Sequence, residues 1–230
     1  MSAQIISCSK WLPERDAFLR EQHLRPADTE LVEKLFGEAK SCAGPIGGYL
    51  EAIPEDPGTK TVSLHGEILH SRLLARHLSS QDRVFPFVAT CGQELSAWVD
   101  SKSDLMENYL AHILAEKATH LIAEELRRDI ESKYTLENLS RMQPGSLPDW
   151  PIEQQGPLFH ILDSIPQKIQ VQLTETYLML PTSSLSGIFF QDPEGFISCQ
   201  LCSRKCPRRK ATFDPQRLAL LEDVHNSSAE

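Results

Sequence analysis

A long stretch of apolar periodicity near the middle of the chain constrains the fold more than any other feature. Between about Ser103 and Ser132, apolar side chains return at steps of three and four residues, as on one face of a helix. Ser103 is a suitable N-cap residue, and Asp104 would then lie in the first turn, where the helix dipole favours a carboxylate. The pattern predicts one long helix over residues 103–132. Its apolar positions are Leu105, Met106, Tyr109, Leu110, Ile113, Leu114, Leu121, Ile122, Leu126 and Ile130.

Shorter segments on both sides of this helix have the composition of strands. Residues 83–90 contain Pro86, which has no backbone N–H to donate, so this segment is predicted to be an edge strand. Residues 184–190 alternate between two faces, and Gly187 favours a bulge or the close approach of a large group. Further strands are predicted at 49–53, at 61–64, in the earlier part of 171–190 and at 196–198.

These elements predict an α+β fold, with a bent antiparallel sheet partly covered by helices and the long helix at its centre. The length of 230 residues suits one domain, or one compact domain with an appendage. We expect residues 1–100 to form an N-terminal α+β portion of that domain. The core is expected over 101–198, followed by a cysteine-rich C-terminal segment over 199–230.

Charge and hydrophobicity exclude some classes of function. The formal net charge of −9 argues against non-specific nucleic-acid binding, which needs a basic surface to displace counterions. No run of about 18 apolar residues is present, so no membrane-spanning segment is expected. The N-terminal residues lack the basic start and apolar centre of a secretory signal, which predicts a cytoplasmic protein.

A rigid loop and a strand provide the first candidate functional site. Proline at positions 144, 148 and 151 fixes φ and removes backbone donors, whereas Gly145 permits φ values that a side chain would forbid. Such a loop holds its carbonyl and amide groups in fixed directions beside Arg141. Taken alone, Arg141 is better explained by an ion pair with an acid such as Asp149 or Glu153, and it is the surrounding Pro-Gly pattern that favours a ligand role.

The order of the motifs that follow resembles the reactivation domain of cobalamin-dependent methionine synthase. That family has an Arg-x-x-Pro-Gly loop, a helix, a Leu-Thr-Glu segment, a Met-x-Pro step and a Ser-x-Ser-Gly strand that ends in aromatic residues. The corresponding segments here are Arg141-Met142-Gln143-Pro144-Gly145, Leu173-Thr174-Glu175, Met179-Leu180-Pro181 and Ser184-Leu185-Ser186-Gly187-Ile188-Phe189-Phe190. The turn over residues 89–92 looks like one found in stand-alone relatives, so a stand-alone member of the family is expected.

The resemblance implies an S-adenosylmethionine site that faces a corrinoid. In the family, an electron from a flavodoxin or ferredoxin reduces an oxidised cobalt(II) corrinoid, and S-adenosylmethionine methylates the cobalt(I) state. The partner implied here is a separate corrinoid protein or cobalamin-dependent methyltransferase. Two residues depart from the family pattern, because Ser146 and Phe189 stand where the synthase has tyrosines. Carried over residue by residue, the cofactor contacts are Arg141, Pro144, Gly145, Ser146, Glu175 and Phe189.

A cysteine cluster provides the second candidate site. Cys199, Cys202 and Cys206 follow one another in a Cys-x2-Cys-x3-Cys-Pro pattern, which is typical of zinc or iron–sulfur ligands. Such sites usually take four ligands, and we expect Cys91 to supply the fourth. Cys42, Cys8, His225 or an open position are the alternatives for that ligand. Free or redox-paired thiols beside a solvated basic patch remain a further interpretation, and the patch suits an acidic flavodoxin or ferredoxin.

The sequence therefore supports two functions of different kinds, and it does not decide whether the chain is an enzyme. The first is an S-adenosylmethionine-binding protein that assists the reductive methylation of a corrinoid protein. The alternative is a metal- or iron–sulfur-binding adaptor or electron-transfer module that keeps the fold without the cofactor. A methyltransferase acting on another acceptor is less favoured, because the glycine fingerprint of a Rossmann fold is missing.

Overall fold

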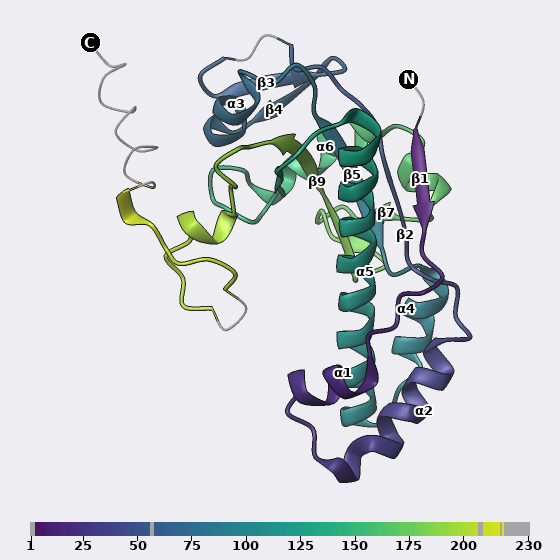
Figure 1. Cartoon of the computed structure of the whole chain (residues 1–230). Coiled ribbons are helices and arrows are strands. Elements are labelled where there is room, and N and C mark those ends of the chain that lie inside the picture. The colour runs from purple at the N-terminus through teal and green to yellow at the C-terminus, as the bar shows by residue number, and fades with distance from the viewer. Residues whose placement is uncertain (1–2, 56–57, 207–208, 217, 219–230) are drawn as a thin grey trace. The chain divides into compact units, whose positions relative to one another are not determined.

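The computed structural model describes residues 3–55, 58–206, 209–216 and 218; Pro207 and His225 of the predicted cysteine site lie outside these ranges (Figure 1). The strands are β1 (Gln4–Ser7), β2 (Ile46–Tyr49), β3 (Thr61–Leu64), β4 (Glu67–His70), β5 (Phe85–Thr90), β6 (Leu139–Met142), β7 (Gln172–Leu173), β8 (Met179–Leu180) and β9 (Ser184–Gln191). The helices are α1 (Arg15–Glu21), α2 (Thr29–Ala39), α3 (Arg72–Leu78), α4 (Gln93–Asp100), α5 (Leu105–Tyr134), α6 (Gln155–Leu162) and α7 (Ile165–Lys168). Short 3-10 turns are η1 (Pro26–Asp28), η2 (Ile152–Gln154) and η3 (Ser198–Leu201).

The main sheet has five strands in the order β1-β2-β5-β9-β6. The pairs β1–β2, β2–β5 and β6–β9 are antiparallel, and β3–β4 and β7–β8 form two separate antiparallel pairs. This architecture confirms the α+β class, the antiparallel sheet and the single long helix that the sequence predicts. None of the described helices is both long enough and apolar enough to cross a membrane.

Three of the predicted strands are corrected by the structure. The strand predicted at 49–53 is replaced by β2 at Ile46–Tyr49, so the two ranges share only Tyr49. β5 lies between β2 and β9, so the segment that contains Pro86 is an interior strand and not an edge strand. The register with β2 runs from Phe87 opposite Tyr49 to Thr90 opposite Ile46, so Pro86 precedes the residues that pair with β2 and its missing N–H is not needed there. The segment predicted as a strand at 196–198 instead leads into η3.

The long helix begins one residue later than its predicted cap would place it. Asp104 Oδ1 accepts hydrogen bonds from the backbone N–H groups of Met106 at 2.9 Å and Glu107 at 3.0 Å. Asp104 is therefore the capping residue, and the prediction of Ser103 is wrong. Two residues with similar capping propensity stand side by side, and only the backbone geometry distinguishes them. The helix ends at Tyr134, before Thr135 with a φ of 54°.

The chain divides into two compact units that each draw on several segments. The first comprises Met1–Leu50, Phe87–Asp129 and Leu162–Leu185, and the second comprises Glu51–Pro86, Ile130–Ile161 and Ser186–Glu230. In the first unit, α1, α2 and α4 lie around the first half of α5 (Figure 1). They bury an apolar cluster that includes Trp11, Phe18, Leu35, Leu95 and Leu114. In the second unit, α3 packs on β3, which pairs with β4 (Figure 1).

Candidate functional site

The outer strand of the sheet, β6, presents the backbone of Arg141 away from its neighbour. The N–H of Asp192 donates to the carbonyl of Asn138 at 3.0 Å, so the polar groups of Asn138 point towards β9. Backbone groups alternate in direction along a strand, so those of Leu139 and Arg141 point away from β9. In agreement, the N–H of Leu139 donates to the Glu131 carboxylate at 3.4 Å. The N–H and C=O of Arg141 therefore lie on the outer edge of β6.

The side chain of Arg141 projects beside an aromatic residue. Arg141 pairs directly with Phe189 across the antiparallel β6–β9 ladder, and residues in such a pair project to the same face. Phe189 is fully buried, whereas Arg141 is partly exposed. The pair therefore places the Arg141 side chain on the same face of the sheet as Phe189.

The loop after β6 is held closed by its own backbone. The N–H of Gly145 donates to the carbonyl of Trp150 at 2.7 Å, and the N–H of Trp150 donates to the carbonyl of Leu147 at 3.1 Å. Gly145 has a φ of 78°, which disfavours any side chain, and a Cβ there would lie 2.9 Å from Ile152 Cδ1. Glycine is thus required both by the backbone conformation and by the packing of Ile152.

Ser146 directs its hydroxyl group back into this loop. Its Oγ donates to the carbonyl of Gln143 at 2.7 Å, and its N–H approaches the same oxygen at 3.2 Å. The hydroxyl therefore stabilises the turn locally.

Two donors in the same loop are buried without an acceptor. Gln143 Nε2 and Trp150 Nε1 have no hydrogen-bond partner among the described residues, and Trp150 is fully buried. An unsatisfied buried N–H costs about 1–3 kcal/mol, so an acceptor-rich ligand or a bound water would stabilise these groups. Sequence reasoning missed both residues, because Gln143 fills a variable place in the motif and Trp150 looks like an ordinary core residue.

Asp149 anchors the loop to the start of α3. Its Oδ2 accepts hydrogen bonds from Ser71 Oγ at 2.6 Å and from the N–H of Leu73 at 2.9 Å, and Oδ1 accepts one from Arg72 Nε at 3.1 Å. Burial alone would raise the pKa of Asp149, but these three hydrogen bonds outweigh it and lower the pKa below its ordinary value. The carboxylate therefore fixes the loop that carries Gly145.

Glu175 lies elsewhere in the chain, in the first unit. It occupies the turn between β7 and β8, where Thr174 N–H donates to the carbonyl of Leu178 at 2.9 Å, and its side chain is exposed. Arg141 and Phe189 belong to the second unit. A role for Glu175 in the same site stays a prediction.

The cysteines predicted as metal ligands are also divided between the units. Cys91 packs in the apolar cluster of the first unit, and burial raises the pKa of its thiol to about 12. That environment disfavours the thiolate that a metal needs. Cys199, Cys202 and Cys206 lie in the second unit. Throughout the described ranges, no three His, Cys, Asp or Glu side chains are grouped so that they could hold a metal ion, and the metal site stays a prediction without geometric support.

Comparison with known proteins identifies the family. The family model of the vitamin B12 dependent methionine synthase activation domain matches residues 72–198, which is more than half of the chain. The chain therefore belongs to this family, which confirms the resemblance that the Arg141 and Ser184 motifs indicate. A search of curated proteins gave no match.

A solved structure shares the fold. The crystal structure of the MetH reactivation domain bound to AdoHcy superposes with a TM-score of 0.61 at 16% sequence identity, covering 86% of this chain and 80% of that chain. At this identity the likeness concerns the fold alone. The family match contains β6, the Arg141 loop and β9, and it ends at Ser198, immediately before the first cysteine of the C-terminal cluster.

Proposed function

We propose that this chain binds S-adenosylmethionine at the outer edge of β6 and assists the reductive methylation of a corrinoid carried by a partner protein. The observation that carries the proposal is the placement of Arg141, whose backbone groups point outward while its side chain projects to the same face of the sheet as that of Phe189. Family membership and the AdoHcy named for the solved relative support the same assignment.

The residues at this edge fit the chemistry of the proposed ligand. S-adenosylmethionine carries a carboxylate, an ammonium group and an adenine ring with several acceptor nitrogens. The guanidinium of Arg141 suits the carboxylate, and a charge-assisted pair of this kind is stronger than a neutral hydrogen bond. Gln143 Nε2 and Trp150 Nε1 supply two buried donors that need acceptors.

The protein's contribution to the reaction would be positional. A sulfonium methyl group is already activated for transfer, so no side chain has to act as a general base. The corrinoid, when bound to its partner and reduced, supplies the nucleophile. Arg141 and the closed loop would hold the methyl donor in one orientation, which lowers the entropic part of the barrier. A flavodoxin or ferredoxin as electron donor, and a cytoplasmic location, belong to this proposal as predictions from the sequence.

Calorimetric titration of the full chain with S-adenosylmethionine and with AdoHcy tests the proposal. We expect both ligands to bind, and Arg141→Ala to weaken binding by about tenfold or more, because a hydrogen bond to a charged group contributes about 1.5–3 kcal/mol. Arg128→Ala is the matched control, since Arg128 is exposed on α5 and pairs with Glu125 at 2.7 Å. Circular dichroism should show that each variant is folded. Absence of binding by folded wild-type protein, or equal affinity in Arg141→Ala, would refute the assignment.

A further inference from the structure

The turn that follows the family match brings two cysteines to the same side. Cys199 lies in η3, and the N–H of Cys202 closes the turn on the carbonyl of Cys199 at 3.4 Å. In 3-10 geometry, residues three apart have eclipsed side chains, and a rise of about 2 Å per residue separates their Cα atoms by about 6 Å. Disulfides most often join Cα atoms about 5.5–6 Å apart. The backbone thus places Cys199 and Cys202 at a separation that a disulfide can span.

One guanidinium group holds both ends of this turn. Arg209 Nη1 donates to the carbonyl of Cys199 at 2.9 Å, and Nη2 donates to the carbonyl of Cys202 at 2.8 Å. Arg209 also donates to the carbonyls of Arg204 at 2.5 Å and Ala211 at 3.4 Å. The guanidinium is planar and its N–H directions are fixed, so the spacing of the carbonyls is fixed as well.

The turn is anchored to the second unit on both sides. Before it, Phe196 is buried with its ring 4.8 Å from that of His77, and its N–H donates to Ser140 Oγ at 2.8 Å. Within it, Leu201 is buried, and after it the N–H of Asp214 donates to the carbonyl of Gln200 at 2.8 Å. The segment that carries the cysteines therefore has a defined conformation, fixed by hydrogen bonds and buried side chains.

We propose that Cys199 and Cys202 form a redox-active dithiol that exchanges with small-molecule disulfides. Both residues are partly exposed, so a small disulfide can reach them, whereas Cys206 is exposed and lies outside the turn. This proposal is independent of the S-adenosylmethionine site. The proposal gives the two cysteines a role that needs no metal ion. Among the described residues, no three His, Cys, Asp or Glu side chains are grouped so that they could hold one.

The exchange balances in two steps. The thiolate of one cysteine attacks a sulfur of the small disulfide, which forms a mixed disulfide and releases one thiolate. The thiolate of the second cysteine then attacks the protein sulfur of that mixed disulfide, which forms the Cys199–Cys202 bond and releases the second thiolate. Two electrons pass from the protein to the small disulfide, and the two thiol protons end on the released thiols.

Equilibration of the full chain in glutathione buffers of graded oxidation, followed by acid quenching and peptide mass analysis, tests the proposal. We expect a disulfide within the peptide that contains Cys199 and Cys202, with the mass of two hydrogens lost. Cys199→Ser should abolish it, whereas Cys206→Ser should leave its midpoint unchanged. A bond that involves Cys206, or no bond in the most oxidising buffer, would overturn the proposal. Stoichiometric zinc or iron in the anaerobically purified chain would overturn it too.

The contribution of Arg209 to the turn can be measured separately, by the midpoint of the thiol–disulfide exchange. Arg209→Ala should shift the exchange equilibrium towards the dithiol by about tenfold, because the carbonyls of the two cysteines are no longer held together. Arg209→Lys keeps the charge but loses the planar fork, so it should resemble Arg209→Ala. Arg204→Ala is the matched control, since Arg204 contributes only its backbone carbonyl to this contact. Equal midpoints in all three variants would show that the turn is not organised by Arg209.

Discussion

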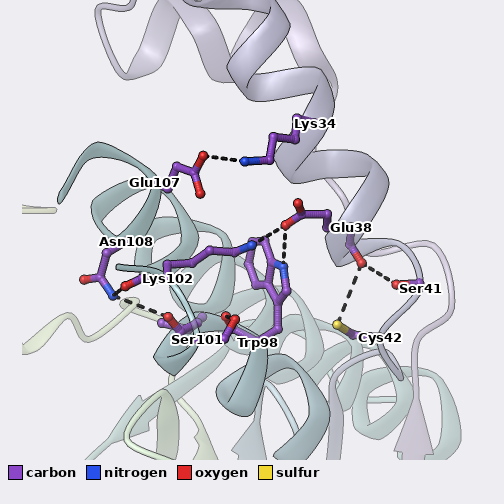
Figure 2. A network of polar contacts seen from close by, with 10 residues as sticks. Lys34, Glu38, Ser41, Cys42, Trp98, Ser101, Lys102, Glu107 and Asn108 are labelled. Atoms are coloured by element: carbon purple, nitrogen blue, oxygen red, sulfur yellow. Dashed lines mark hydrogen bonds and ion pairs between the residues drawn. The ribbon is translucent and has the colours of Figure 1, made fainter. Parts of the chain in front are cut away.

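Glu38 Oε2 accepts a hydrogen bond of 2.9 Å from Trp98 Nε1, and this contact joins α2 to α4 in the first unit (Figure 2). The same oxygen accepts a hydrogen bond from Lys102 Nζ, and Lys102 also lies 4.9 Å from the centroid of the Trp98 ring. One carboxylate thus holds an indole and an ammonium group that contact each other. The largely buried position of Lys102 makes the carboxylate its necessary counter-charge.

Removal of this carboxylate should destabilise the helical part of the first unit. Glu38→Ala leaves two donors unsatisfied, so we expect a loss of about 1 kcal/mol in the free energy of unfolding. This loss is smaller than at a fully buried site, because the Glu38 side chain is partly exposed to solvent. Glu33→Ala on the same helix is the matched control, because Glu33 pairs with Arg15 at an exposed site and its loss should be near zero. Urea denaturation measures both changes. An equal effect of the two substitutions would contradict the importance of the Glu38 contact.

The same contact should make stability depend on pH. Hydrogen bonding from Lys102, and then from Trp98, lowers the pKa of Glu38 below its ordinary value of 4.5. A carboxylate with a lowered folded-state pKa adds stability above its unfolded pKa, and that stability is lost as the pH falls through the folded pKa. The difference in free energy of unfolding between wild type and Glu38→Gln should therefore be constant near neutral pH and should shrink below about pH 4.5. If this difference in free energy of unfolding grew as the pH fell, the pKa of Glu38 would be raised and not lowered in the folded protein.

Gly145 should tolerate substitution less well than another glycine with similar backbone angles. Gly145→Ala combines a φ of 78° with a Cβ 2.9 Å from Ile152, so we expect a loss of about 2 kcal/mol or more. Gly66 has a φ of 81°, but a Cβ added there would meet no atom within 4 Å, so Gly66→Ala should cost only the backbone strain of about 1 kcal/mol. Thermal unfolding compares the two. S-adenosylmethionine affinity should fall in Gly145→Ala alone.

The connection between the Arg141 loop and α3 can be measured with a double-mutant cycle. Asp149 accepts a 2.6 Å hydrogen bond from Ser71, so Asp149→Ala and Ser71→Ala should each destabilise the protein. Because the two residues contact each other, the double variant should lose less than the sum of the single losses, with a coupling of about 1–2 kcal/mol. Additive losses in urea denaturation would show that the two side chains act independently.

The sequence predicts this fold best where the signal is local and repeated. The periodicity of α5 extends over many turns, so its range is correct within two residues at each end, although the cap is Asp104 and not Ser103. The edge position predicted for the strand that contains Pro86 is wrong, because it rests on the proline alone and not on its partners. The true position depends on where the register with β2 begins, which no local pattern specifies.

The candidate site also has one part that the sequence predicts and another that only the structure shows. The Arg-x-x-Pro-Gly motif locates the loop, since φ restriction by proline and glycine is a local property. The buried donors of Gln143 and Trp150 depend on how that loop folds back on itself, so they emerge only from the structure. The opposition of Arg141 and Phe189 likewise needs the β6–β9 register, because the two residues are far apart in the sequence.

Cys91 and Cys206 should differ strongly in their reaction with iodoacetamide. Burial raises the pKa of the Cys91 thiol to about 12, so only about one molecule in ten thousand carries the thiolate at pH 8. Cys206 is exposed and should be alkylated first, whereas Cys91 should react only after unfolding in urea. Mass analysis of peptides from native and unfolded protein follows both sites in one experiment. Alkylation of Cys91 in the native protein at the rate of Cys206 would mean that its thiol is accessible and ionised, which would restore it as a candidate metal ligand.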